Sequence, residues 1–515
     1  MYRTVGVIGA AALGALALLL VVGARAPREV EAASLSVFSS ADSGPGSFRG
    51  AVEAANANPS ITKIVLRNWL PITLTSTVTY TGSQSLTVQG DSPFFNRVIE
   101  GSGDPCGLFD SDSAGDLTFS QVTLRGSSCF AIQVAPPGGG GEVVVSLDKV
   151  VIEQVASGVR LVEVGQTDLA WTLSVKRSRI EAYDSVGVTI SEDGPGGVQA
   201  SFVNSEVSDC GGQGVSVLEQ QDGDVSFSAS GSQFNDNGDA GVEITELNGG
   251  HLDVALSGSG VNGNGQSGVT LREAGEGDLE LTGAYLELTG NHGFGLYGLE
   301  TEMGDFAATL SGLQASGNYS NNLYLDESNE GDADFHVSGS TLNDSEIGTG
   351  WTALESGDGT LTIWMSGVTV DNNGSDGLYL FENGEGAFGL TVLATRVESN
   401  VGYALLANEG ADGSLTFLVS GSKAIGNTNG WSLTENDGGG LIGTVSATSS
   451  QMNSGHGYLL AEYDVGAFDV TFSLSSAAGN TGGGTFATAD AELGHIHEIL
   501  SALAPYDLTN VVVGP

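Results

Sequence analysis

A column of glutamates is the feature of this 515-residue sequence whose residue type and spacing could do chemistry. A glutamate returns at steps of 26 to 29 residues, usually 27. If each step is one turn of a stacked fold, neighbouring carboxylates lie about 5 Å apart. Two unit charges at that distance repel by about 3 kcal/mol at an effective dielectric of 20, so the column needs compensation. Its members are Glu163, Glu192, Glu219, Glu246, Glu273, Glu300, Glu327, Glu355, Glu382, Glu409, Glu435 and Glu462.

Three kinds of compensation are open: hydrogen bonds from backbone N–H groups, protonation, or bound cations. Hydrogen bonding is favoured, because each glutamate precedes a glycine-rich turn whose donors need partners. Ionised, hydrogen-bonded carboxylates would have lowered pKa values, whereas dominant repulsion would raise them. Calcium is the second candidate, since an aspartate follows several of the glutamates by five residues, although the tandem Gly-Gly-x-Gly-x-Asp calcium repeat is absent. The candidate metal ligands are Glu219, Glu273, Glu300, Glu327, Asp224, Asp278, Asp305 and Asp332.

Two further groups are candidates for catalysis or ligand binding. Asp332, Asp334 and His336 are the densest local set of catalytic residue types, although Asp332 also belongs to the repeating turn. A glycoside hydrolase needs two carboxylates about 5 Å or about 6.5 to 9.5 Å apart, and stacked turns produce such spacings everywhere. Tyrosines at outward strand positions would offer ring faces to sugars, or would stack on one another to stabilise the sheet. These tyrosines are Tyr297, Tyr324 and Tyr379.

The glutamates close a six-residue pattern of small, apolar, variable, apolar, variable and Glu, as in Gly241 to Glu246. Alternation at period two predicts a strand with one buried face. An acidic turn, a second alternating run, a Ser-Gly-Ser corner and a short third run separate the copies. The sequence therefore predicts an all-β parallel β-helix solenoid of about 15 coils of roughly 27 residues, with a capping helix at each end.

An asparagine recurs four residues before the small residue, where a tight corner would stack the amides in a column. This column resembles the asparagine ladder of right-handed parallel β-helix proteins of the pectate-lyase-like (pectin lyase fold) superfamily, over roughly residues 100 to 490. The resemblance implies a right-handed helix and introduces a polysaccharide lyase as an alternative function. Lyases need basic residues, and residues 180–395 contain only Arg272, so Arg160, Lys176, Arg177 and Arg179 are the one basic cluster available. The asparagines are Asn237, Asn264, Asn291, Asn318, Asn373, Asn400 and Asn427.

The net charge is −46, and after Arg179 the only basic residues are Arg272, Arg396 and Lys423. Such a surface repels nucleic acid and anionic membranes, so we expect neither as a partner. The apolar run from Val5 to Gly23 reads as a secretory signal peptide, or as an uncleaved anchor. We expect Cys106 and Cys129, about one coil apart, to form a disulfide in an exported protein, and Cys210 to remain a buried thiol.

The ends of the solenoid need caps, because open sheet edges pair with other chains. Ser47 to Asn56 is a candidate amphipathic helix, and Ala489 to Leu503 is a second, with Leu493, Ile496, Leu500 and Leu503 on one face. The predicted organisation is a signal peptide (1–32), an N-terminal cap with the first coils (33–100), a regular β-helix (101–488) and a C-terminal cap (489–515).

The function that these features favour is non-catalytic. The sequence predicts an exported rod, secreted or at the cell surface, that acts as an adhesive, glycan-binding or structural protein, with no certain cofactor besides a candidate calcium ion. We expect a polysaccharide or cell-surface glycan as partner, and no membrane contact beyond the export signal. The alternative is a carbohydrate-active enzyme, either a polysaccharide lyase or a glycoside hydrolase. Regular coil lengths favour the non-catalytic function, because an enzyme usually interrupts its repeat to build a cleft.

Overall fold

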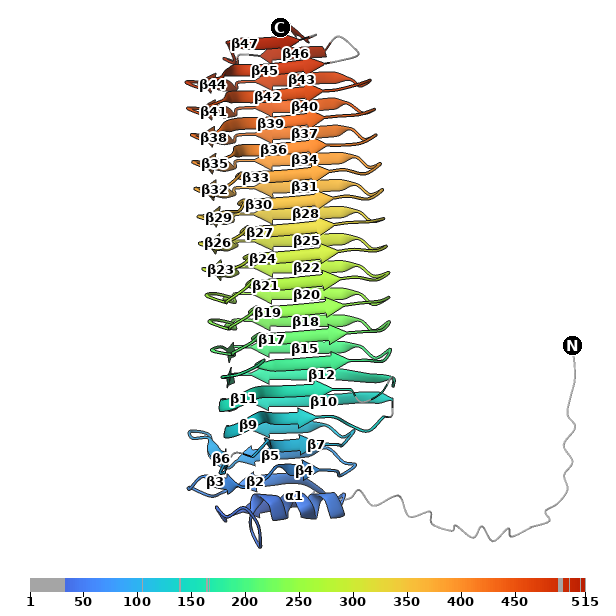
Figure 1. Ribbon diagram of the computed structural model, residues 1–515, viewed down its shortest axis with the longest axis vertical. Coiled ribbons are helices and arrows are strands. Elements are labelled where there is room, and N and C mark those ends of the chain that lie inside the picture. The colour runs from blue at the N-terminus through green and yellow to red at the C-terminus, as the bar shows by residue number, and fades with distance from the viewer. Residues whose placement is uncertain are drawn as a thin grey trace, which may run out of the picture.

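The structure is a computed structural model that describes residues 33–103, 105–138, 140–163, 165, 167–489, 494–499, 501–509 and 511–514. These residues form one helix and 48 strands, stacked as parallel rungs along a rod (Figure 1). The rod is a parallel β-solenoid of about 17 turns spaced about 27 residues apart. The predicted fold class is confirmed, although the coil number exceeds the predicted 15. The predicted signal peptide lies outside the described residues.

Three parallel sheets make the sides of the rod. The first sheet contains 19 strands: β1 (Ala33–Val37), β2 (Ile61–Leu66), β5 (Leu86–Gly90), β8 (Leu117–Ser120), β10 (Gly141–Asp148), β12 (Leu169–Lys176), β15 (Val198–Val203), β18 (Val225–Ser230), β20 (Leu252–Ser257), β22 (Leu279–Ala284), β25 (Phe306–Ser311), β28 (Ala333–Ser338), β31 (Leu361–Ser366), β34 (Phe388–Leu393), β37 (Leu415–Ser420), β40 (Leu441–Ser446), β43 (Phe468–Ser473), β46 (Gly494–Ile499) and β48 (Val511–Gly514).

The second sheet holds the glutamate repeats, and the third is a short side of three-residue strands. The second comprises β3 (Ile72–Leu74), β4 (Val78–Tyr80), β6 (Arg97–Gly101), β7 (Gly107–Ser111), β9 (Val122–Val134), β11 (Val151–Val162), β13 (Arg179–Ala182), β14 (Val188–Glu192), β16 (Glu206–Val207), β17 (Val215–Glu219), β19 (Val242–Glu246), β21 (Val269–Glu273), β24 (Leu296–Glu300), β27 (Leu323–Glu327), β30 (Trp351–Glu355), β33 (Leu378–Glu382), β36 (Tyr403–Glu409), β39 (Asn429–Glu435), β42 (His456–Glu462), β45 (Gly483–Ala489) and β47 (Tyr506–Thr509). The third comprises β23 (Glu287–Thr289), β26 (Gln314–Ser316), β29 (Thr341–Asn343), β32 (Thr369–Asp371), β35 (Arg396–Glu398), β38 (Lys423–Ile425), β41 (Ser449–Gln451) and β44 (Ser476–Ala478).

The repeat predicts the register because its alternation decides which residues are buried. Val242 and Ile244 of β19 are fully buried and pair with the matching residues of β17 and β21 without a register shift. Gly241, which opens the copy, stands where a Cβ atom would come within 2.3 Å of Val261 and 2.8 Å of Asn264. The small residue is therefore required by the stacked corner beside it, not by the strand itself.

The asparagines form the predicted ladder, and the structure extends it. The side-chain Oδ1 of Asn291 accepts the backbone N–H of Asn264 at 3.1 Å and its Nδ2 at 2.9 Å, and the same pair of bonds recurs between other neighbouring coils. The series pauses at Ser345, and there Asn322 takes the place of the usual glycine and bridges Asn318 to Asn373. Asn453 and Asn480, which the sequence pattern did not include, continue the ladder toward the C-terminus.

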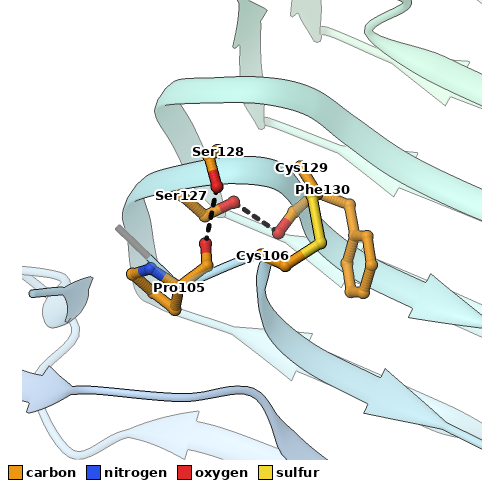
Figure 2. The surroundings of a disulfide bond; sticks show 6 residues. All are labelled: Pro105, Cys106, Ser127, Ser128, Cys129 and Phe130. Atoms are coloured by element: carbon orange, nitrogen blue, oxygen red, sulfur yellow. Dashed lines mark hydrogen bonds between the residues drawn. A yellow bond between two sulfur atoms is a disulfide. The ribbon is translucent and has the colours of Figure 1, made fainter. Parts of the chain in front are cut away.

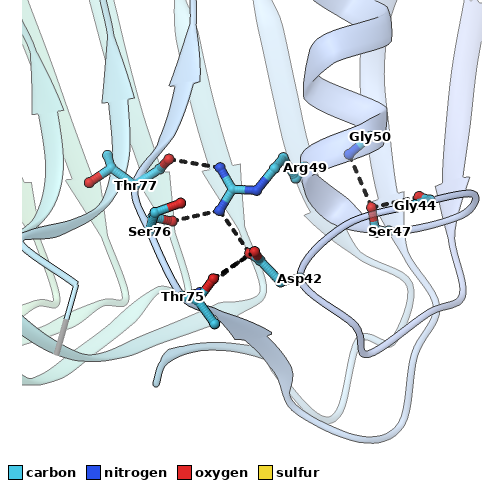
Figure 3. A network of polar contacts seen from close by, with 8 residues as sticks. All are labelled: Asp42, Gly44, Ser47, Arg49, Gly50, Thr75, Ser76 and Thr77. Atoms are coloured by element: carbon cyan, nitrogen blue, oxygen red, sulfur yellow. Dashed lines mark hydrogen bonds and ion pairs between the residues drawn. The ribbon is translucent and has the colours of Figure 1, made fainter. Parts of the chain in front are cut away.

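The N-terminal cap is the predicted helix, α1 (Phe48–Ala57). The Ser47 hydroxyl accepts the N–H of Gly50, and Phe48, Ala51, Val52 and Ala55 are its buried residues, as the apolar pattern predicts. Figure 3 shows how Arg49 of this helix fastens the cap to the first coils. Its guanidinium donates to Asp42 Oδ1 at 2.7 Å and to the carbonyl oxygens of two residues just after β3. The cap and the first turn therefore form one unit.

The C-terminal cap prediction is wrong for the residues that the structure describes. Residues 494–499 form strand β46, which pairs with β43 and β48, whereas Leu493 and Leu500 lie outside the described residues. The edge of the first sheet offers backbone partners to this segment, and its residues alternate between buried and exposed: Gly494 and Ile496 face inward, His495 and His497 outward. The two histidines stack with ring centroids 6.2 Å apart, rather than diverging as on a helix.

The predicted disulfide joins Cys106 and Cys129, whose Cα atoms are 4.7 Å apart (Figure 2). It connects the turn before β7 to the middle of β9, so it staples two neighbouring coils near the N-terminal end. Cys210 is the buried free thiol expected, at the asparagine-ladder position. Burial raises its pKa to about 12.

Removing the disulfide by Cys106→Ser with Cys129→Ser is expected to lower stability by about 3 kcal/mol, because the bond closes a loop of 23 residues in the unfolded chain. Thermal unfolding followed by circular dichroism measures the change. A reductant should lower the midpoint of the wild type but leave the double variant unchanged. Equal midpoints for wild type and variant would contradict the stapling role.

Candidate functional site

The glutamates from Glu192 to Glu462 stand at the last position of second-sheet strands, Glu163 directly follows β11, and all are buried inside the rod. Those from Glu192 to Glu462 are 0 % exposed. From Glu192 to Glu435, Oε1 of each accepts the backbone N–H two residues further on, at 2.7 to 3.0 Å. The predicted hydrogen bonds from the glycine-rich turn are thus confirmed.

The second oxygen of the same glutamates has no conventional donor. Oε2 of every column member from Glu192 to Glu435 is buried without an N–H or O–H partner among the described residues. Burial, together with contact with the carboxyl groups of Glu246 and Glu300, raises the pKa of Glu273 to about 11. Burial likewise raises the pKa of other members from the ordinary 4.5: to about 7 for Glu192 and Glu435, about 8 for Glu300, about 9 for Glu409 and about 10 for Glu219 and Glu355.

These shifts oppose the lowered pKa values expected from the sequence. The turn N–H groups satisfy one oxygen, but they do not offset the loss of hydration at the other. A proton shared between adjacent carboxyl groups would supply the missing donor to Oε2. The seven glutamates whose pKa is raised to about 7 or above are accordingly best described as protonated or proton-sharing carboxyl groups inside the rod.

The second acidic column has a different environment, because its aspartates are exposed. Asp278 Oδ1 accepts the backbone N–H of Asp305 at 3.0 Å, and Asp305 Oδ1 accepts that of Asp332 at 2.9 Å. Asp224 makes the same bond to His251, and Asp332 to Thr360. One oxygen of each aspartate therefore ties neighbouring coils together.

The buried glutamates and exposed aspartates do not converge on a shared centre. Across the part of the chain that the structure describes, no group of three or more His, Cys, Asp or Glu side chains is arranged to hold a metal ion. Calcium remains a prediction for Glu219, Glu273, Glu300 and Glu327 with their aspartates.

Two of the three predicted ligand-binding tyrosines come together, and the third does not. Tyr297 of β24 and Tyr324 of β27 stack with centroids 5.2 Å apart, and Phe294 packs against both. The Tyr324 hydroxyl donates to Asp326 at 3.0 Å. Thr352 of β30 separates Tyr324 from Tyr379 of β33. The contact favours cross-coil stacking over a free sugar platform for this pair.

Two of the three catalytic candidates also lie together, and the third does not. Asp334 and His336 both point outward from β28, and His336 Nε2 lies 3.0 Å from Asp334 Oδ1. Asp332 belongs to the turn and is bonded within the aspartate column. The structure therefore unites Asp334 with His336 and excludes Asp332 from their site.

His336 borders a feature that the sequence analysis missed, the Trp364 groove. This is an open depression of about 390 Å³ on the outer face of the first sheet. We define the groove by His336, Trp364, Gly389, Thr391, Leu418 and Ile442, which come from β28, β31, β34, β37 and β40. The His336 and Trp364 rings lie 5.7 Å apart, and Leu418 and Ile442 are large apolar side chains exposed to solvent.

Gly389 opens the floor of this groove. An added Cβ atom there would meet nothing closer than 3.9 Å, so the backbone does not require a glycine.

The signal for the groove lies in one outward column of the sheet. Thr282 and Thr309 occupy it in preceding coils, whereas His336, Trp364 and Leu418 replace the hydroxyl residue at the groove.

The geometry suits binding better than hydrolysis. Asp334 is flanked in its own outward column by Ala307 and Thr362, so the adjacent coils place no carboxylate beside it in that column. The next carboxylate in the column, Glu280, stands two coils away, at about 10 Å. That spacing is just beyond the range for two glycosidase carboxylates, and His336 is the one basic side chain among the described residues that line the groove.

The fold and site define a parallel β-helix with an aromatic groove on one sheet. No protein-family model matches the chain, and no curated protein matches it. Among solved structures, the chain is similar to ORF18 of Geobacillus virus E2, with 12 % identity over 73 % of this chain and 61 % of that one and a TM-score of 0.25. The chain thus spans about six tenths of the viral protein.

Two polysaccharide-acting proteins show the same level of similarity. The catalytic domain of a GH87 alpha-1,3-glucanase in complex with nigerose is 11 % identical over 95 % of this chain and 69 % of that one, with a TM-score of 0.21. Pectate lyase Pel9A is 12 % identical over 78 % of this chain and 81 % of that one, also with a TM-score of 0.21. At these values the similarities say nothing about activity, and the β-helix is shown by the strand pairing of this chain itself.

Proposed function

We propose that the protein is an exported, non-catalytic rod that binds a neutral polysaccharide along the Trp364 groove. The observation that carries this proposal is that Trp364 stands beside the open floor at Gly389, in an outward column that threonines occupy in the preceding coils. An indole ring offers an apolar face with a polar edge, which suits a sugar ring. The threonines of the groove and the Asp334–His336 pair supply hydrogen-bonding groups around that face.

The shape and charge of the groove restrict the ligand. From β28 to β40 the groove crosses five coils, about 19 Å along the rod, which fits several linked rings rather than one. Its surroundings are acidic, and the whole chain has a net charge of −46. A polyanionic chain would be repelled, so a neutral polysaccharide is the expected class.

Trp364→Ala is expected to weaken retention of the protein on its polysaccharide at least tenfold, because the stacked ring face is lost. Affinity electrophoresis against a panel of neutral and anionic plant and bacterial polysaccharides measures this effect. Gly389→Leu should weaken retention similarly by filling the floor, and its Cβ has room in the fold.

Thr309→Ala, in the same outward column but on β25, is the matched control and should retain binding. Retention unaffected by both groove substitutions would contradict the proposal. The same panel is examined for chain cleavage. Cleavage that Asp334→Asn abolishes would favour the alternative, a glycoside hydrolase using the Asp334–His336 pair.

A further inference from the structure

Five large apolar side chains are exposed at one corner of the N-terminal coils. The exposed fractions are 65 % for Phe38, 79 % for Trp69, 66 % for Leu70, 85 % for Phe94 and 66 % for Phe95. Soluble proteins rarely gather exposed aromatic side chains in this way unless the patch contacts something. We call these five residues the apolar corner.

The five residues lie together because their loops follow stacked strands. Phe38 follows β1, Trp69 and Leu70 follow β2, and Phe94 and Phe95 follow β5, the first three strands of the first sheet. Backbone bonds continue the stack beyond the strand ends: Arg67 N–H donates to Val37 O at 2.9 Å, and Asp91 N–H to Leu66 O at 3.1 Å.

Polar contacts hold these side chains in place. The guanidinium of Arg97, which is nearly buried and bonded to Asp91 at 2.7 Å, lies 4.2 Å from the centre of the Trp69 ring. The Ser92 hydroxyl accepts the N–H groups of both Phe94 and Phe95 at 3.3 Å. Arg67 lies against the Phe38 ring, 6.0 Å from its centre. The corner is therefore preorganised around two arginines.

The charge of the chain is distributed unevenly along the rod. Residues 33–179 contain 13 acidic and 10 basic residues, whereas residues 180–515 contain 47 acidic and 3 basic residues. The charge that excludes an anionic membrane as a partner belongs to the later coils. The coils that bear the apolar corner are close to neutral and are not subject to that exclusion.

The sequence also places an apolar segment next to this end. Val5 to Gly23 has 19 residues, close to the length that crosses a bilayer as a helix, and Gly23 is ten residues from the start of β1. Ten residues reach at most about 35 Å. A chain that kept this segment in a bilayer would hold its first coils within that distance of the lipid.

We propose that the apolar corner docks on a lipid bilayer, so that the N-terminal end of the rod contacts the membrane and the acidic coils project away from it. Aromatic side chains favour the headgroup region, where an apolar ring and a polar edge are both accommodated. The exposed guanidinium of Arg67, beside the Phe38 ring, suits the phosphate level, whereas Arg97 is nearly buried and holds Trp69 in place. This contact is independent of the Trp364 groove.

Quenching of Trp69 fluorescence tests the proposal directly. The full-length chain is reconstituted with phosphatidylcholine vesicles whose acyl chains carry bromine near the headgroup. Three of the five tryptophans are buried in the core, at positions 171, 351 and 431, and Trp364 is on β31, far along the rod. We expect quenching in the wild type that disappears in Trp69→Phe. Two results would each overturn the proposal: no quenching in the wild type, or quenching that persists in Trp69→Phe. This holds whether or not the N-terminal segment is retained.

A second variant keeps Trp69 and removes its neighbours. Phe94→Ser with Phe95→Ser is expected to reduce Trp69 quenching at a given lipid concentration and to weaken vesicle binding about tenfold. Val401→Ser, a similarly exposed apolar residue in the later coils, is the control and should change neither. Sedimentation velocity tests the other occupant, a second copy of this chain. If the wild type is a dimer, the double variant is a monomer and Trp69 of the wild type is not quenched, the corner joins two copies and the lipid proposal is wrong.

Discussion

Lowering the pH from 9 to 5 is expected to raise the midpoint of thermal unfolding. The folded pKa values of seven column glutamates lie between about 7 and about 11, above the ordinary 4.5 of an unfolded chain. A raised folded pKa means that the folded state binds the proton more tightly. This stabilisation is complete below about pH 4.5 and is lost as the pH rises through the folded values. Each such carboxyl contributes about 1.4 kcal/mol per pH unit within its window.

Glu273→Gln isolates the cause. The amide is neutral at every pH, its oxygen can accept the Gly275 N–H, and its NH₂ can donate to a neighbouring carboxyl oxygen. We expect the variant to have a higher midpoint than the wild type at pH 9 and a weaker dependence on pH. Asp278→Asn, in the exposed column, is the control and should leave the dependence unchanged.

Repeating these thermal unfolding measurements with millimolar calcium and with a chelator tests whether the column binds a cation. A wild-type midpoint raised by millimolar calcium, with a smaller gain in Glu273→Gln, would support cation binding in the column. A wild type that loses stability on acidification from pH 9, with Glu273→Gln destabilised at pH 9, would show that the carboxyl groups are ionised in the fold.

Replacing Asn291 by Leu is expected to cost about 4 kcal/mol and to unfold the central coils at a lower temperature. Asn291 is buried; its Oδ1 accepts two bonds from Asn264, and its Nδ2 donates to Asn318 Oδ1 and Val261 O. Leucine leaves these partners buried without bonds, and each costs about 1 to 3 kcal/mol. Denaturant unfolding measures the loss.

The matched control for this prediction is Asn329→Ala. Asn329 lies in the turn after β27, and its side chain makes no hydrogen bond among the described residues. It should unfold as the wild type does. A leucine variant as stable as the control would mean that the ladder guides the corners without stabilising them.

Most of the fold could be predicted because each coil repeats one pattern. Alternation in Val242 to Ile244, the glycine at the corner and the asparagine four residues before it are local signals that each copy restates. The C-terminal segment differs, since Ile496 fits both helical and strand periodicity. The segment forms a strand because the free edge of β43 offers backbone hydrogen-bond partners, and the segment's own residues do not indicate that this edge is available.

The candidate site was less predictable because it depends on surroundings rather than residue type. The sequence located the glutamates and their turns, but the burial of Oε2 reverses the sign of the expected pKa shift. It placed Asp334 and His336 together, yet Trp364 is 28 residues further on and joins them only through the stacking of β28 on β31. Gly389 has no side chain that could indicate a site, and it contributes to the groove only because it leaves the floor open.

The direction of the backbone hydrogen bonds has a mechanical consequence. Strands lie across the rod, so the bonds between coils run along its axis (Figure 1). Tension applied through the two chain ends would peel a terminal coil from the stack bond by bond, and each coil of about 27 residues would release about 90 Å of slack. At the N-terminal end the Cys106–Cys129 bond closes a covalent loop that a pulling force cannot open. The coils before and after that loop would therefore uncoil under load from their own ends, while the residues between the two cysteines remained a closed loop.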